Sequence, residues 1–64
     1  MKKLFKLNVW YGQYVFVANT REEVLEMATS NEFISTNHIT IDDVVEVKGY
    51  KVEGPSGEVG GYQE

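Results

Sequence analysis

Hydrophobic and polar residues alternate over residues 4–11, which is the pattern of a half-buried β-strand. A second apolar run covers 14–18, and only Gly12-Gln13 separates the two runs. Glycine at the first position of a two-residue connection suits a type II′ turn. We therefore predict a β-hairpin with its turn at Gly12-Gln13, in which Trp10 faces Val15.

This register divides the hairpin into two faces, because cross-strand partners lie on the same side of a sheet. The predicted core face carries Phe5, Leu7, Val9, Tyr11, Tyr14, Phe16 and Ala18. The predicted outer face carries Lys6, Asn8, Trp10, Val15 and Val17. A three-residue turn would instead exchange the faces of the second strand.

A helix is predicted to follow the hairpin. Thr20 is a good N-cap, and Glu23 three residues later completes a capping box. Apolar residues then recur at helical spacing, at Val24, Met27 and Ala28. We expect the helix over 21–30, followed by Asn31 in the left-handed conformation.

The chain beyond the helix is predicted to hold a third strand region over 38–47. The acid pair Asp42-Asp43 interrupts it, which indicates a bulge or a break into two short strands. Residues 50–52 either continue this strand or form a small fourth one. Before it, Phe33-Ile34 is expected to pack as a lid or a short turn, and 35–37 to form a loop.

These elements predict a small two-layer α+β domain, ββαβ(β), over residues 1–53. Because the helix connects the second strand to the third, we expect an antiparallel sheet of order 2-1-3 with the helix packed on one face. Residues 54–64 begin with Gly-Pro-Ser-Gly and have little to bury. They are predicted to form a glycine-rich, flexible C-terminal tail.

The chain has 64 residues and a net charge of −4, and it has no cysteine. Residues 1–21 carry four cations and no acid, whereas 22–47 carry seven acids and no Lys or Arg. Such an acidic region disfavours non-specific binding of nucleic acid by that face, because carboxylates repel phosphates. No apolar run approaches the length of a membrane span, so we expect a cytoplasmic protein and no membrane partner.

Candidate chemistry is sparse in this sequence. Asp42, Asp43 and Glu46 offer oxygen ligands for Mg²⁺ or Ca²⁺, but the spacing and central glycine of an EF-hand are missing. His38 has no nucleophile in a motif-like relation to it. The glycines of 54–61 lack the Gly-Lys-Ser/Thr ending of a phosphate loop. We therefore predict no catalytic residue, no metal, no cofactor and no enzymatic activity.

One segment carries a resemblance to known proteins. Residues 10–18, Trp-Tyr-Gly-Gln-Tyr-Val-Phe-Val-Ala, are followed by Thr20-Arg21-Glu22-Glu23-Val24-Leu25. A hairpin leading into such a helix resembles small uncharacterised proteins of bacteriophages and of Firmicute prophages. The resemblance implies a phage or prophage accessory gene, acting in the host cytoplasm, and it implies no activity.

We expect this chain to be a regulatory or interaction protein that binds another protein, with host factors among the candidate partners. The cluster of Trp10, Val15 and Val17, with Lys6 beside it, is either partly covered by the chain itself or a partner surface, the simplest partner being a second copy. The alternative function is an acidic mimic of nucleic acid that inhibits a nucleic-acid-handling enzyme. That function would use Glu22, Glu23, Glu26, Asp42 and Asp43.

Overall fold

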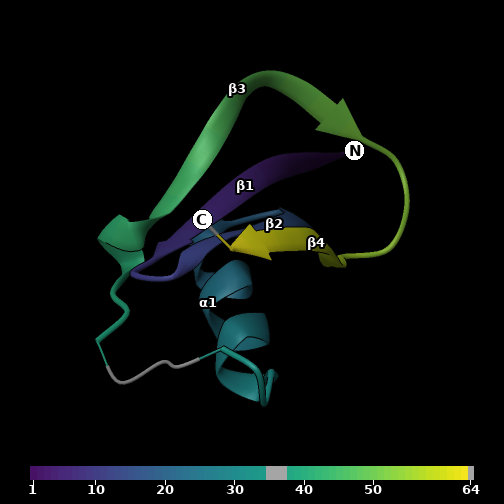
Figure 1. The fold of residues 1–64 in the computed structure, drawn as a ribbon. Coiled ribbons are helices and arrows are strands. Elements are labelled where there is room, and N and C mark those ends of the chain that lie inside the picture. The colour runs from purple at the N-terminus through teal and green to yellow at the C-terminus, as the bar shows by residue number, and fades with distance from the viewer. Residues whose placement is uncertain (35–37, 64) are drawn as a thin grey trace.

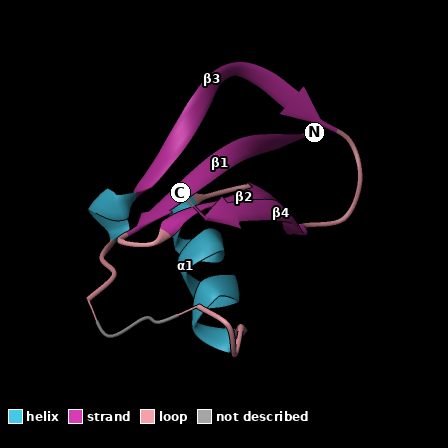
Figure 2. Cartoon of the chain, viewed as in Figure 1, coloured by secondary structure: helices cyan, strands magenta, loops and turns pink. Residues whose placement is uncertain are grey.

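A computed structural model describes residues 1–34 and 38–63 of the chain. Its elements are β1 (Lys2–Val9), β2 (Gly12–Ala18), α1 (Arg21–Ser30), the 3₁₀ helix η1 (Ile41–Asp43), β3 (Val44–Val52) and β4 (Gly57–Gln63). The strands form one antiparallel sheet of order β3-β1-β2-β4, and α1 lies against one face of it (Figures 1 and 2). The α+β class is confirmed. The order differs from the expected 2-1-3 because a fourth strand lies beside β2.

The hairpin of β1 and β2 forms with a different register from the one predicted. Phe5 pairs with Phe16 and Val9 pairs with Gly12, so the two-residue connection is Trp10-Tyr11. The predicted turn at Gly12-Gln13, and the pairing of Trp10 with Val15, are therefore wrong. Between the predicted and the observed register, the partner of each strand residue changes by an even number of positions. The strand residues therefore keep the faces that were predicted for them.

The helix α1 begins as the sequence predicts. The Glu23 backbone N–H donates to Thr20 Oγ1 at 3.2 Å, which caps the first turn. The helix ends at Ser30, but Asn31 is extended, with φ −89° and ψ 119°, and not left-handed. The Asn31 side chain instead accepts the Phe33 backbone N–H at 2.8 Å.

The segment after the helix only partly covers the core. Ile34 is 5% exposed and packs into the core, whereas Phe33 is 77% exposed. The segment forms the predicted short turn, in which the Ile34 backbone N–H donates to the Asn31 carbonyl oxygen at 3.3 Å. Ile34 also covers the core as a lid would, and Phe33 does not. The predicted loop over 35–37 lies outside the described residues.

The third strand starts later than predicted because the acid pair forms η1. Asp43 Oδ2 accepts the Thr40 backbone N–H at 2.8 Å, which gives η1 its capping box. Strand β3 then runs from Val44, but its register with β1 shifts sharply: Glu46 pairs with Phe5, and Lys51 pairs with Lys3. Four residues of β3 therefore stand opposite one residue of β1, and β3 arches away from the sheet (Figure 1).

Residues expected in a C-terminal tail form β4 instead, so the predicted boundary at residue 53 does not separate a domain from a tail. Phe16 pairs with Glu58 and Tyr14 pairs with Gly61. A Cβ on Gly61 would lie 2.6 Å from Tyr14 Cδ1, so the Tyr14 ring lies directly against this glycine. Glycine thus permits a close approach of strand and ring that no other residue would allow.

The core lies between the sheet and α1. Its buried members are Phe5, Leu7, Phe16, Ala18, Val24, Ala28, Ile34 and Val44. Each large side chain buried there stabilises the fold by about 1.5–3 kcal/mol, before the cost in conformational entropy. Among the described residues, no helix has the length and apolar character required to cross a membrane.

Candidate functional site

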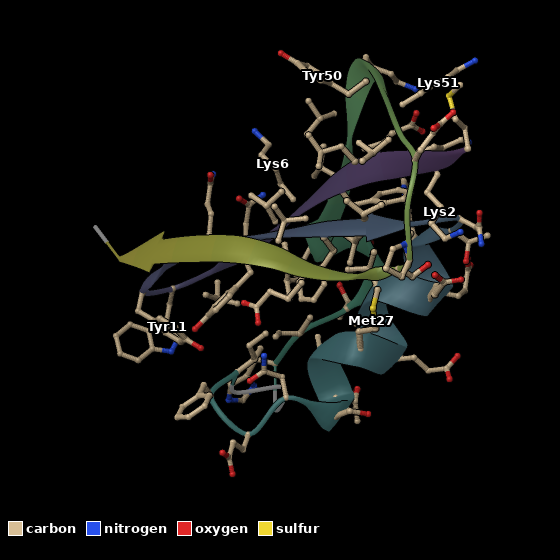
Figure 3. The ribbon with its side chains drawn as sticks, turned by 90° about the vertical axis from the view of Figure 1, so that its right-hand side faces the viewer. Lys2, Lys6, Tyr11, Met27, Tyr50 and Lys51 are labelled. Atoms are coloured by element: carbon tan, nitrogen blue, oxygen red, sulfur yellow. The ribbon has the colours of Figure 1, made fainter. Side chains whose placement is uncertain are left out.

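The hairpin turn and the segment after α1 meet at one end of the molecule. Trp10 is 89% exposed, and its ring centroid lies 5.1 Å from that of Tyr11, edge to face. The Tyr11 hydroxyl donates to the Phe33 carbonyl oxygen at 3.1 Å. We call Trp10, Tyr11 and Phe33 the aromatic end. Figure 3 shows Tyr11 at this end and Lys2 at the opposite end of the sheet.

Tyr14 connects the aromatic end to the sheet. The rings of Tyr11 and Tyr14 meet edge to face, with centroids 6.1 Å apart. Hydrogen bonding with Tyr11, together with desolvation and the nearby charge of Glu58, raises the pKa of Tyr14 to about 12. The Tyr14 ring also lies against Gly61 of β4. The exposed Trp10 thus stands on a turn whose neighbours are fixed by several contacts.

A small hollow lies beside Trp10. It is lined by Asn8, Val9, Trp10, His38, Ile39 and Asp43, and its volume is about 190 Å³. Ligand sites typically enclose roughly 300–1,000 Å³. Asp43 in this lining is already engaged by the backbone N–H of Thr40. The hollow is therefore suited to a single inserted side chain and is too small for a typical substrate.

The predicted outer-face cluster is divided in the structure. Lys6 pairs with Val15 in β2 and with Val45 in β3, so a lysine lies between two valines on this face. Val17 is only 6% exposed. Trp10 lies in the turn and not on this face. The structure thus brings Lys6 and Val15 together but does not assemble the predicted surface of Trp10, Val15 and Val17.

The acidic candidates also divide, into exposed residues and residues that stabilise local structure. Glu22, Glu26 and Asp42 are exposed. Asp43 caps η1. Glu23 is half-buried at the start of α1, where its Oε2 accepts the Asn19 side-chain N–H at 3.5 Å.

The carboxylate of Glu23 is held by two neighbouring segments. The Ser56 hydroxyl and the Asn19 amide stabilise its charged form, and they lower the pKa of Glu23. Burial opposes this effect, and Oε1 is buried without a hydrogen bond of good geometry, although Ser56 lies close. Glu23 therefore serves the fold by joining α1 to the connection between β3 and β4.

The acids do not form a metal centre within the described residues, where no three His, Asp or Glu side chains come close enough to hold an ion. Glu46, one of the oxygen ligands considered from the sequence, instead lies 3.9 Å from the ammonium groups of Lys3 and Lys48.

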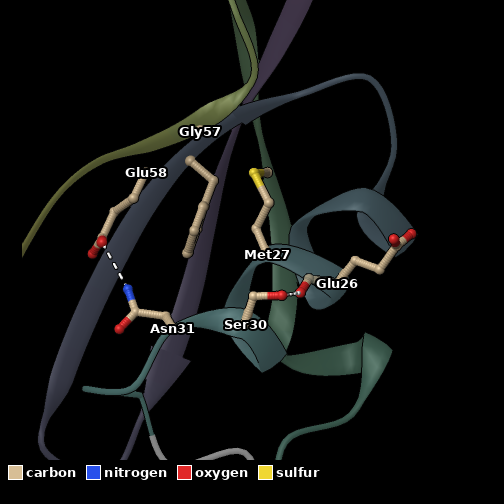
Figure 4. Close-up of a pocket in the computed structure, with 7 residues that line it drawn as sticks. Glu26, Met27, Ser30, Asn31, Gly57 and Glu58 are labelled. Carbon is tan, nitrogen blue, oxygen red and sulfur yellow. Dashed lines mark hydrogen bonds between the residues drawn. The ribbon is translucent and has the colours of Figure 1, made fainter.

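A larger groove, which the sequence did not predict, separates α1 from β4 (Figure 4). It is lined by Phe16, Glu26, Met27, Ser30, Asn31, Gly57 and Glu58, and its volume is about 420 Å³. The Asn31 side-chain N–H donates to Glu58 Oε1 at 2.9 Å across one end of it. The only sequence signal was a Gly-Pro-Ser-Gly turn followed by a short run with Val59 and Tyr62.

Comparison with protein-family models, with curated proteins and with solved structures gave no match to this chain.

Proposed function

We propose that this protein is a small, non-enzymatic binding module that contacts another protein through its aromatic end. The observation that carries the proposal is the exposure of Trp10, at 89%, next to Tyr11, whose hydroxyl donates to the backbone of Phe33, itself 77% exposed. Water contact with two large aromatic side chains is unfavourable, and a partner would relieve it. Exposed apolar groups gathered in one place mark protein contacts more often than isolated ones do.

The aromatic end is also held in position before any partner arrives. The Tyr11 hydroxyl bonds the backbone of the Phe33 segment, which joins the two parts of the surface. A surface that is already ordered loses less conformational entropy on binding. Trp and Tyr are enriched among the few interface residues whose truncation costs at least about 2 kcal/mol.

The other two candidate surfaces have less support. Dimerisation through the outer sheet face would have to bury Lys6 between Val15 and Val45. Removing a lysine charge from water is costly unless a carboxylate pairs with it.

The acidic mimic would depend on five carboxylates, of which Glu23 and Asp43 already serve as helix-capping or helix-anchoring groups. That leaves Glu22, Glu26 and Asp42 to imitate phosphates. Both alternatives remain proposals of lower rank than the aromatic end.

The test is affinity capture from lysate of the native cell, with three forms of the protein as bait. We expect wild type to retain a partner that Trp10→Ala loses, by at least about 30-fold in affinity. Tyr50→Ala is the matched control, because Tyr50 is also an exposed aromatic residue, at 59%, but lies on the β3 arch. A captured protein whose retention is unaffected by Trp10→Ala would contradict the proposal.

Fluorescence gives an independent measurement, because Trp10 is the chain's single tryptophan. Titration with the purified partner should shift its emission to shorter wavelength as the indole leaves water. An unchanged emission on a complex of proven stoichiometry would exclude Trp10 from the interface. The same shift on concentrating the protein alone would instead identify a second copy as the partner.

A further inference from the structure

The free edge of β4 and the groove beside it carry a second inference, which is independent of the aromatic end. β4 stands last in the order β3-β1-β2-β4, so within the described residues only one of its edges is paired in the sheet. The backbone N–H and C=O groups on its other edge are available to an added strand.

This edge lacks most of the features that block strand addition. The sequence of β4, Gly-Glu-Val-Gly-Gly-Tyr-Gln, has no Pro and no Lys, and its one irregularity is a bulge at Val59. The opposite edge, β3, is different: it arches at Gly49, with φ 85°, and carries Lys48 and Lys51. Arches and lysines are devices that keep edge strands from pairing.

The groove lies where the side chains of an added strand would point. Glu58 pairs with Phe16, a core residue, so Glu58 is on the sheet face that α1 covers. A residue of an added strand opposite Glu58 would project from the same face, toward α1. The groove between β4 and α1 is open at that position, with Met27 and Phe16 in its lining (Figure 4).

The charge of the groove selects the side chain that would enter it. Its lining, as far as the structure describes the chain, includes two acidic residues, Glu26 and Glu58, and no Lys, Arg or His. The Asn31 side-chain N–H engages one oxygen of Glu58. Figure 4 shows the Glu58 and Glu26 side chains on opposite sides of Met27, pointing away from each other. A Lys or Arg side chain would therefore lay its apolar stem along Met27 and present its charge to the Glu58 carboxylate.

We propose that β4 and α1 bind an extended segment of another protein, which adds as a strand to the free edge of β4 and places a Lys or Arg side chain in the groove. A second copy of this chain fits less well. Two β4 strands paired together would bring only Glu58 charges to the junction, with no cation from either strand.

The test uses two blocked seven-residue peptides of alternating Thr and Val, which differ only in a central Lys or Glu. Amide chemical shifts of the uniformly labelled protein are followed by NMR at peptide concentrations up to the millimolar range. We expect the Lys peptide to perturb Gly57 to Gly61 and Met27, and the Glu peptide to bind at least tenfold more weakly. Glu58→Gln should weaken binding of the Lys peptide about two- to fivefold, and Glu26→Gln should have the smaller effect.

Glu22→Gln is the matched control, because Glu22 is an exposed acid of the same helix that does not line the groove. It should leave the affinity unchanged. Equal binding of the two peptides, an equal effect of Glu22→Gln, or no perturbation of β4 would each overturn the proposal. Perturbation of β4 on concentrating the protein without peptide would overturn it in favour of a second copy.

Discussion

The two edges of the sheet are held by different kinds of contact. β3 places Val44, 1% exposed, in the core opposite Leu7 of β1. β4 places none of its described side chains in the core cluster. It is held by backbone pairing with β2, by the Tyr14 ring against Gly61, and by the bond from Asn31 to Glu58.

This difference means that one edge strand contributes mainly to the stability of the fold, and the other leaves its backbone available to a partner. An edge that is fixed by burial of apolar side chains contributes directly to the free energy of unfolding. An edge that is fixed by a few close contacts contributes less, and its backbone stays open to a partner. We therefore expect substitutions at the buried end of β3 to lower the stability of the whole domain and substitutions in β4 to act locally.

The largest effect should come from Val44→Ala. Two buried methyl groups are lost and a cavity remains, so the free energy of unfolding should fall by about 2–3 kcal/mol. For a chain this small the total is about 3–10 kcal/mol, and the loss is a large fraction of it. Urea denaturation followed by circular dichroism measures it, as a lower midpoint with an unchanged slope.

The neighbouring Val45→Ala is the control for this prediction. Val45 is 40% exposed on the outer face, so the same chemical change should cost less than about 1 kcal/mol. If Val45→Ala is as costly as Val44→Ala, the burial of β3 does not explain its stability.

The second effect should come from Gly61→Ala. The new methyl group would meet Tyr14 Cδ1 at 2.6 Å and the Gln13 carbonyl oxygen at 3.0 Å. Tyr14 must then move, at a cost of about 1–2 kcal/mol. Hydrogen exchange should show faster opening of the β4 amides, with little change in those of β1.

Gly60→Ala is a closely matched control, because a Cβ at Gly60 would meet nothing within 4 Å. It should leave exchange in β4 almost unchanged. Equal acceleration by the two substitutions would show that backbone freedom, rather than the contact with Tyr14, determines how β4 is held.

Local pattern was sufficient to predict much of this fold. Thr20 and Glu23 marked the start of α1, and the alternation in 4–11 and 14–18 marked both hairpin strands and their faces. These signals are local, because a cap or an alternating strand is encoded within a few residues.

Long-range contacts decided the features that the sequence did not reveal. The hairpin turn lies at Trp10-Tyr11. The Tyr11 hydroxyl donates a hydrogen bond to the carbonyl oxygen of Phe33, which is 22 residues away in the sequence. β4 forms because β2 offers it a partner and Tyr14 lies over Gly61. The groove between α1 and β4 exists only because β4 pairs with β2. Since the sequence pattern of residues 54–64 is typical of a flexible tail, it does not predict this groove.

The smallest effect should come from Tyr11→Phe, which tests whether Tyr14 links the aromatic end to β4. Loss of the Tyr11 hydroxyl should cost about 0.5–1.5 kcal/mol and return the pKa of Tyr14 from about 12 toward its ordinary value of 10.0. Carbon NMR of the Tyr14 ring measures this pKa. Tyr50→Phe, on the β3 arch, should leave it at about 12.

The same shift predicts how stability depends on pH. In the unfolded chain Tyr14 releases its proton near pH 10, while in the folded chain it holds the proton until about pH 12. The contribution of Tyr14 is thus complete below pH 10 and is lost as the pH rises from 10 to 12, because the unfolded state then binds fewer protons. Tyr11→Phe should show a smaller loss than wild type over this range. If both proteins lose the same stability over this range, the raised pKa of Tyr14 does not depend on Tyr11. The aromatic end would then have no electrostatic connection to β4.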